Sequence, residues 1–110
     1  MANTFKNEQV QNVTTGWSSI GSQLNATTQR TIIGMTIANT TSGVISVDVS
    51  IYNNGSTRTY LIKSAPVPVG GALIVVGGDQ KVVLDNQDLV QVKSNTVNSA
   101  DVVMSVLDIT

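Results

Sequence analysis

The segment Gly77-Gly78-Asp79-Gln80-Lys81 carries two adjacent glycines, an acid and a lysine, which are residue types that can hold a phosphate group. A nucleotide-binding glycine loop requires a helix directly after it, because the free amide groups of that helix bind the phosphate. The residues that follow, Val82-Val83-Leu84, instead favour a β-strand, and no Ser or Thr follows Lys81 to bind a magnesium ion. We therefore predict a tight hairpin turn between two strands here and no bound cofactor.

Three aspartates, Asp79, Asp85 and Asp88, fall in adjacent predicted turns, where hard oxygen ligands can bind calcium. Their spacing does not match the loop in which Asp or Asn ligands alternate with other residues. An aspartate in a turn usually accepts hydrogen bonds from the neighbouring backbone instead. We therefore predict no metal site.

The sequence contains no histidine and no cysteine. Their absence excludes the Ser-His-Asp and Cys-His nucleophile systems, histidine and thiolate metal sites, and disulfide bonds. Carboxylates are the remaining acid–base groups, and nothing in the sequence marks a carboxylate pair in an apolar pocket. A carboxylate-only hydrolase is therefore the least favoured alternative, and we predict no catalytic residues and no enzymatic activity.

Charged residues make up 12% of the 110 residues, about half the usual share, and the formal net charge is −1. This charge balance does not suit a nucleic-acid backbone or an acidic membrane surface, so we predict neither as a partner. The apolar run Ala72–Val76 is too short to span a membrane, and the polar N-terminal residues do not resemble a signal peptide. We expect a soluble domain, made in a cytoplasm, whose weakly charged surface meets other protein.

Strand-forming residues dominate the composition, with 17 valines, 9 isoleucines and 13 threonines. In Val44–Ile51, alternation places Ile45, Val47, Val49 and Ile51 on a buried face and three polar residues, Ser46, Asp48 and Ser50, on a solvated face. In Thr31–Ile37, alternation places Ile33, Met35 and Ile37 on one face, and Gly34 indicates a bulge or a close backbone approach.

Turn residues divide the chain into about eight strands. Asn54-Gly55 predicts a hairpin that pairs residues 44–52 with residues 57–63. Pro66 and Pro68 predict an extended connector or sheet edge, and Asp101–Ile109 predicts a closing strand with Val102, Met104 and Val106 facing inward. In that strand Leu107 and Ile109 break the alternation, which suggests that its end is covered on both sides.

This pattern predicts an all-β, single-domain antiparallel β-sandwich, of jelly-roll or immunoglobulin-like type. The domain spans residues 1–110, with the core sandwich in residues 29–110 and an N-terminal arm plus a first strand in residues 1–28.

The aromatic residues are few, and two of them lie in the polar N-terminal segment. Phe5 and Trp17 either plug the core or anchor the chain in a partner's pocket, and core packing is the favoured interpretation. If the segment binds a partner, Phe5, Val10 and Trp17 are the candidate contact residues. Tyr52 and Tyr60 lie in the predicted hairpin, where cross-strand packing accounts for them.

From Ile37 onwards, about two-thirds of the chain, a series of motifs occurs in order. They are ANTT at Ala38–Thr41, YLIK and PVPVGG within Tyr60–Gly71, GGDQKVVL at Gly77–Leu84 and SVLDI at Ser105–Ile109. In these motifs the chain resembles small virion structural proteins of tailed bacteriophages, including cyanophage-like capsid decoration (cement) proteins. The motifs are structural rather than catalytic. The resemblance implies a β-sandwich assembled in many symmetric copies, and it implies no enzyme.

The function favoured by this resemblance is a capsid decoration protein in a virion assembled in the cytoplasm of a host bacterium. Its partners would be copies of itself, with a homotrimer favoured, and the major capsid protein or other virion proteins. A neck, tail or fibre component of the same particle is the alternative. A third hypothesis is a carbohydrate-binding adsorption module, which would need Trp17, Tyr52 and Tyr60 in one exposed patch.

Overall fold

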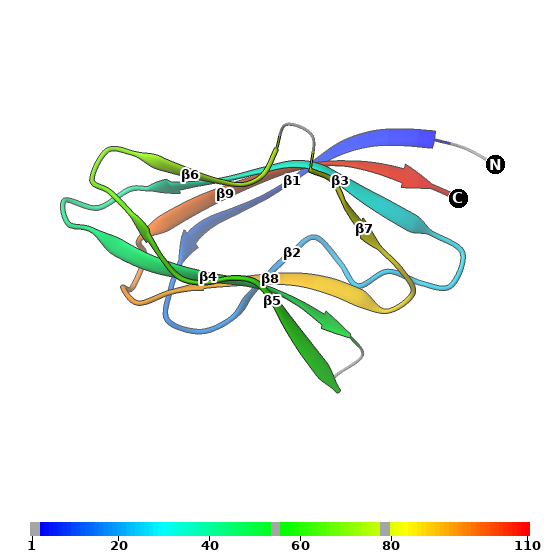
Figure 1. Cartoon of the computed structure of the whole chain (residues 1–110), viewed down its shortest axis with the longest axis horizontal. Coiled ribbons are helices and arrows are strands. Elements are labelled where there is room, and N and C mark those ends of the chain that lie inside the picture. Colours follow the sequence, from blue (N-terminus) through cyan, green and yellow to red (C-terminus); the bar gives the residue numbers. More distant parts are fainter. Residues whose placement is uncertain (1–2, 54–55, 78–79) are drawn as a thin grey trace.

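The computed structural model describes residues 3–53, 56–77 and 80–110 of the chain. In this described part, nine strands form two antiparallel sheets that pack face to face (Figure 1). Sheet A contains β1 (Asn3–Val13), β3 (Gln29–Asn39), β6 (Ala72–Val76), β7 (Val82–Leu84) and β9 (Ala100–Ile109). Sheet B contains β2 (Ser18–Ile20), β4 (Ile45–Asn53), β5 (Thr57–Val67) and β8 (Asp88–Ser94). The predicted all-β sandwich is confirmed.

The order of the strands decides between the two sandwich types that the sequence left open. Sheet A runs β1-β9-β3 and then β6 and β7, and sheet B runs β2-β8-β4-β5. Consecutive strands cross between the sheets everywhere except at the β4–β5 hairpin and between β6 and β7. When β6 and β7 are counted as one strand, each sheet has four strands. The order of the strands in the two sheets is then that of a jelly roll.

The segment between β6 and β7 does not join a hairpin, so this prediction was wrong. Both strands pair with β3, since β6 lies opposite residues 35–38 and β7 lies opposite residues 30–32. They therefore run in the same direction as two parts of one interrupted edge strand. Gly77 lies at the interruption of this strand, and Gly78 and Asp79 lie outside the described residues. A strand and not a helix follows the segment, as the sequence predicted.

The predicted hairpin of β4 and β5 is confirmed, with Tyr52 opposite Arg58 and Ser46 opposite Pro66. Its turn residues, Asn54 and Gly55, lie outside the described residues. Strand β5 forms an edge of sheet B, where the missing N–H group of Pro66 removes no bond that the sheet needs, and Pro68 follows the strand.

The core fills the space between the two sheets, because alternate side chains of every long strand point there. Val47 and Val49 of β4 meet Met35 and Ile37 of β3 and Met104 of β9 in one buried cluster. Each fully buried aliphatic side chain of this kind contributes about 1.5–3 kcal/mol relative to an exposed one.

A bulge in β3 changes which isoleucine enters the core. The register to β9 shifts between Ile32 and Gly34, which confirms the bulge expected at Gly34. The extra residue reverses the alternation, so Ile32 is fully buried and Ile33, which we expected inside, is only partly buried.

The end of β9 follows the same alternation as the rest of the strand. Leu107 and Ile109 point outward and are partly buried, whereas Asp108 occupies the inward position between them. The alternation is therefore unbroken, contrary to the interpretation from the sequence, although both sides of this end are at least partly covered, as expected. An acidic residue at a core position had disguised a regular pattern.

The described N-terminal residues belong to the sheets. Strand β1 pairs with β9 from Asn3 to Val13, and Val13 is fully buried. The short strand β2 pairs with β8. The segment expected to contain an arm and a first strand is thus, from residue 3 onwards, the edge strand of sheet A followed by a first strand of sheet B.

A buried ion pair joins β3 and β9 inside one end of the sandwich. The Arg30 guanidinium donates two hydrogen bonds to the Asp108 carboxylate, from Nε at 2.7 Å and from Nη2 at 3.0 Å. Both residues are at least nine-tenths buried. The Glu8 carboxylate lies 3.8 Å from the Arg30 guanidinium, and the Lys6 ammonium group lies 3.6 Å from the Asp108 carboxylate. Strand β1 therefore adds one group of opposite charge to each member of the pair. The hydrogen bonds from Arg30, and then the charges of Arg30 and Lys6, lower the pKa of Asp108 below its ordinary value.

A glycine allows this ion cluster to be covered. Gly21, directly after β2, has a φ angle of +77°, and a Cβ atom at this position would overlap the Glu8 carboxylate. The backbone of Gly21 therefore closes over the cluster where a larger residue would not fit.

The buried side chain of Asn39 organises the loops at the other end of the sandwich. Its amide nitrogen donates to the carbonyl oxygens of Gly43, Val67 and Pro68 at 2.8–3.2 Å. Its oxygen accepts from the backbone N–H of Thr41 at 2.8 Å. The turn expected after β3 therefore forms around a side chain that also holds the end of β5.

We predict that Asp108→Asn lowers the free energy of unfolding at pH 7 by about 3 kcal/mol, because it leaves the Arg30 charge buried without its closest carboxylate. Since the pKa of Asp108 is lowered in the folded state, its stabilisation is present above the ordinary aspartate pKa of about 4 and is lost as the pH falls through the lowered value. The stability difference between the natural protein and the variant should therefore shrink below about pH 4. Urea unfolding at several pH values measures it.

Asp85→Asn is the matched control, because Asp85 is exposed in the turn between β7 and β8. It should change the stability at pH 7 by less than about 0.5 kcal/mol. A variant at Asp108 that is as stable as this control would contradict the structural role of the pair.

Candidate functional site

The outer face of sheet A carries apolar side chains in rows that cross the strands. The registers place Phe5 opposite Leu107, Leu107 opposite Thr31, and Thr31 opposite Val83. Phe5 is 75% exposed and Val83 is 60% exposed, although both belong to regular strands. These four residues therefore form a row across β1, β9, β3 and β7 that is exposed at both ends and partly buried at Leu107 and Thr31.

A second row crosses the same face nearer to its other end. It consists of Gln9 opposite Val103, Val103 opposite Thr36, and Thr36 opposite Ile74. Ile74 is 70% exposed and Val103 is 47% exposed. Amide and hydroxyl side chains, among them Asn7 and Ser105, lie between the two rows.

This face also lacks charge. Among the described strand residues that point outward from sheet A, Asp101 is the only charged one, and its carboxylate accepts a hydrogen bond from the backbone N–H of Asn12. Exposed apolar residues with few charges are typical of the central part of a protein–protein interface. We call this surface, with its two rows and Asn7 and Ser105, the apolar face.

The outer face of sheet B has the opposite character. Here the Arg58 guanidinium lies between two rings, 4.0 Å from the centroid of Trp17 and 4.3 Å from the centroid of Tyr52. Arg58 also donates a hydrogen bond of 2.7 Å to the hydroxyl of Ser50. We expected Ser50 on the solvated side of β4, but it is fully buried, because the hydrogen-bonded Arg58 side chain lies over this position.

Two lysines extend this stack of rings and cations. Lys93 lies 4.7 Å from the centroid of Trp17, and Lys63 lies 4.7 Å from the centroid of Tyr60. The rings of Trp17 and Tyr60 are 6.0 Å apart and tilted by 57°. The structure thus brings Trp17, Tyr52 and Tyr60 together, as the carbohydrate hypothesis required. Each ring, however, already has a cation over it, so the stack is not an open aromatic platform for a sugar ring.

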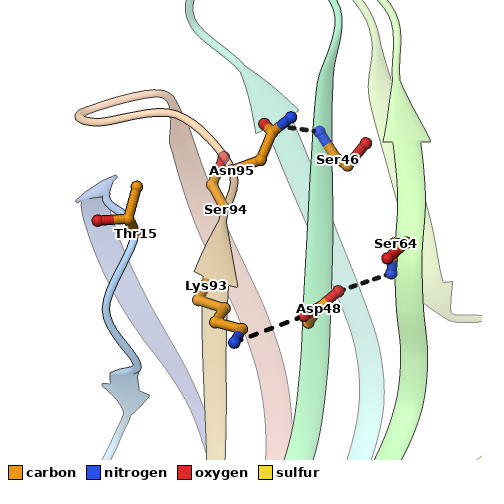
Figure 2. Close-up of a pocket in the computed structure, with 7 residues that line it drawn as sticks. All are labelled: Thr15, Ser46, Asp48, Ser64, Lys93, Ser94 and Asn95. Atoms are coloured by element: carbon orange, nitrogen blue, oxygen red, sulfur yellow. Dashed lines mark hydrogen bonds and ion pairs between the residues drawn. The ribbon is translucent and has the colours of Figure 1, made fainter.

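A polar pocket of about 300 Å³ opens on sheet B, and Lys93 of the stack is one of its lining residues. Figure 2 shows the side chains that line it. Its lining is contributed by β4, β5 and β8, by the start of the β8–β9 connection and by the connection between β1 and β2. The lining residues are Thr15, Ser46, Asp48, Ser64, Lys93, Ser94 and Asn95. None of these side chains is purely hydrocarbon, so the pocket presents hydroxyl, amide, carboxylate and ammonium groups.

Asp48 is the residue that organises the pocket. One carboxylate oxygen accepts a hydrogen bond of 2.6 Å from the backbone N–H of Ser64, and the other lies 3.9 Å from the Lys93 ammonium group (Figure 2). Ser64 has a φ angle of +53°, at a point where the register between β4 and β5 shifts. The carboxylate therefore holds an irregular part of β5 in place.

The three residues predicted as partner contacts do not come together. Phe5 lies on the apolar face, so core packing, the interpretation we favoured for it, was wrong. Trp17 is half-buried on the outer face of sheet B, on the opposite side of the sandwich. Val10 lies opposite Val102 and packs against the core.

The aspartates considered for calcium are used by the chain itself where the structure describes them. One oxygen of Asp88 accepts from the backbone N–H of Asp85, and the other accepts from the Asn53 amide. Asp79 lies outside the described residues. The described part of the chain contains no group of three or more His, Cys, Asp or Glu side chains that could hold a metal ion.

No helix in the described part of the chain has the length and apolar character needed to cross a membrane.

No family model matches the sequence, and no curated protein matches it at a significant level. Solved structures, however, share its fold over almost the whole chain. A protein from the disulfide-linked pili that form Bacillus endospore appendages has a TM-score of 0.55 and 14% identity, over 100% of this chain and 91% of that one. A protein in the capsid of Helicobacter pylori bacteriophage KHP30 has a TM-score of 0.52 and 9% identity, over 98% of this chain and 87% of that one.

At these identities the likeness shows the fold alone. The narrower resemblance to tailed-phage decoration proteins stays a prediction.

The stack on sheet B can be tested with fluorescence, because Trp17 is the single tryptophan of the chain. We predict that Arg58→Met increases the quenching of Trp17 by the neutral quencher acrylamide and lowers the free energy of unfolding by about 1–2 kcal/mol. The reason is the loss of two partly desolvated cation–π contacts and of the hydrogen bond to Ser50.

Lys63→Met is the control, because this cation contacts Tyr60 and not Trp17. It should leave the emission of Trp17 unchanged. Equal quenching in both variants would show that Arg58 does not shield the indole ring.

Proposed function

We propose that this chain is a structural subunit of a bacteriophage particle, and that within the particle it is a capsid decoration (cement) protein. The observation that carries the proposal is the apolar face, a regular sheet surface with exposed Phe5, Ile74 and Val83 and almost no charge. A surface of this kind is expected to be covered by another protein when the chain performs its function.

The fold supports the same proposal. Jelly rolls build many viral shells, and a protein in the capsid of bacteriophage KHP30 is similar in fold over nearly the whole chain. The pilus protein shares it too, but the pili are described as disulfide-linked, and this sequence has no cysteine with which to form such links. Support from the fold is an analogy and does not specify a position in a particle.

In this proposal the apolar face docks on the outside of the shell, against the major capsid protein. The two rows, anchored by Phe5 and by Ile74, supply the contact, and copies of the chain associate as a homotrimer at a local three-fold position. The sequence suggested that an N-terminal arm binds the shell. We propose docking through a sheet face instead, because β9 fixes residues 3–13 in the sheet. The outer face of sheet B then points away from the shell.

A neck, tail or fibre subunit would share the fold and could use the same face. The number of copies per particle separates the two roles, since decoration requires hundreds of copies, whereas a neck or tail ring requires roughly a dozen or fewer. Quantitative mass spectrometry of purified particles, with the major capsid protein as the internal reference, measures this number. A low copy number would move the protein to the neck or tail.

We predict that Phe5→Asp weakens binding to heads assembled without the protein by about 30-fold. A buried aromatic anchor at an interface typically contributes 2 kcal/mol or more, and the new carboxylate would lose its hydration on docking. Co-sedimentation with such heads measures the affinity, and light scattering after size exclusion measures the oligomeric state.

Val44→Asp is the matched control, because Val44 is 64% exposed but lies in the loop before β4, away from the apolar face. It should bind like the natural protein. Full-affinity binding by Phe5→Asp would overturn docking through this face. Deletion of residues 1–15 is a poorer test, because it removes β1 and the buried Val13 as well.

A further inference from the structure

The polar pocket on sheet B has hydrogen-bonding groups that the described chain leaves unused. Within the described residues, the side-chain hydroxyls of Thr15, Ser46 and Ser64 have no hydrogen-bond partner, and neither has the amide nitrogen of Asn95. The oxygen of that amide is occupied, because it accepts from the backbone N–H of Ser46 at 3.0 Å. The groups available to a ligand are therefore mostly hydroxyls, each of which can donate and accept.

The charges of the pocket balance. Asp48 and Lys93 are its two charged lining residues, and they face one another at 3.9 Å (Figure 2). An anionic or cationic ligand would have to compete with this pair, whereas a neutral ligand can accept from the ammonium group and donate to the carboxylate at once. The pocket therefore favours a neutral molecule with many hydroxyl groups.

Hydrogen bonds within the chain hold the backbone segments that line the pocket. Asp48 holds the backbone of Ser64, Asn95 holds the backbone of Ser46, and Trp17 packs against Lys93 at the rim. The backbone N–H of Ser94 also bonds to the carbonyl of Thr14 and so fixes the segment that carries Thr15. A prearranged site loses less entropy on binding than a flexible one.

The size agrees with this chemistry. A volume of about 300 Å³ lies at the lower end of the range for small-molecule sites, which suits one or two sugar rings better than a long polymer in a groove. We propose that this pocket binds a neutral saccharide, with Ser46, Asp48, Ser64, Lys93 and Asn95 as the hydrogen-bonding groups. The proposal does not rest on the proposed function, although a pocket on the side away from a shell would be free to meet host glycans.

The test is a titration of the isotopically labelled full chain with glucose, galactose and N-acetylglucosamine, followed by two-dimensional amide NMR. We expect saturable shifts of the amide signals of Ser46, Ser64, Lys93 and Asn95 with at least one of these sugars. The double variant Ser46→Ala/Ser64→Gly should bind that sugar about 10-fold more weakly, because two hydrogen bonds are lost. Glycine suits the positive φ of position 64, so the variant should keep the fold.

Ser105→Ala is the matched control, because this serine lies on the apolar face at the other side of the sandwich. It should bind like the natural protein. Glucuronic acid is the charged probe. The proposal is overturned if none of the neutral sugars gives saturable shifts, if glucuronic acid alone does so, or if the double variant binds as tightly as the control. None of these outcomes would affect docking through the apolar face, which Phe5→Asp tests.

Discussion

The ladder between β3 and β9 is the constraint on which the rest of the structure depends. Strand β3 pairs with β9 on one side and with both β6 and β7 on the other, so it supports every part of sheet A except β1. Its bulge before Gly34 sets which residues on either side face inward. Because of this bulge, Arg30 and Ile32 share the interior with Met35 and Ile37. Without it, one half of the strand would turn its core residues to the solvent.

The same ladder between β3 and β9 places most of the charged strand residues of sheet A inside the sandwich. Arg30 and Asp108 meet inside the sandwich, and Lys6 and Glu8 point toward them from the edge strand. Inward-pointing charges of this kind also discourage an edge strand from pairing with other chains. On sheet B, Asp48, Arg58, Lys63 and Lys93 all lie on the outer face. Among the outward-pointing strand residues that the structure describes in sheet A, Asp101 alone is charged, so the two sides of the domain differ sharply in the partners that they suit.

Local pattern was enough to predict much of the fold, and the exceptions have identifiable causes. The alternation in β4 and β9 and the Asn-Gly dipeptide predicted two strands and the β4–β5 hairpin, because these signals depend on neighbouring residues. Strands β6 and β7 both pair with β3, which lies far away in the sequence. Local pattern could not show this pairing, so the glycine pair between β6 and β7 resembled a hairpin turn. Asp108 was missed because an acid at an inward position looks like a break in the pattern until its partner is known.

The candidate surfaces could be predicted only in part for the same reason. Low charge indicated a surface that meets other protein, but the rows through Phe5 and Ile74 require the registers of sheet A. The stack of Trp17, Arg58 and Tyr52 joins the β1–β2 connection to the distant hairpin. The polar pocket draws on four separate segments of the chain. Its serines are ordinary strand and loop residues in the sequence, and no local signal distinguishes them.

The pairing of Asn3 with Ile109 has a consequence for how the protein folds. Of the nine described strands, β1 is made first and its neighbour β9 last, so β1 cannot take its place in sheet A until the strands between them have been made. Closing such long loops costs entropy before the contacts repay it, and sheets built in this way fold in milliseconds to seconds rather than microseconds. Phe5 stays exposed throughout this interval and beyond it. Until β1 docks, the edge of β9 is also unpaired, so this is the stage of folding at which the protein is most prone to aggregate.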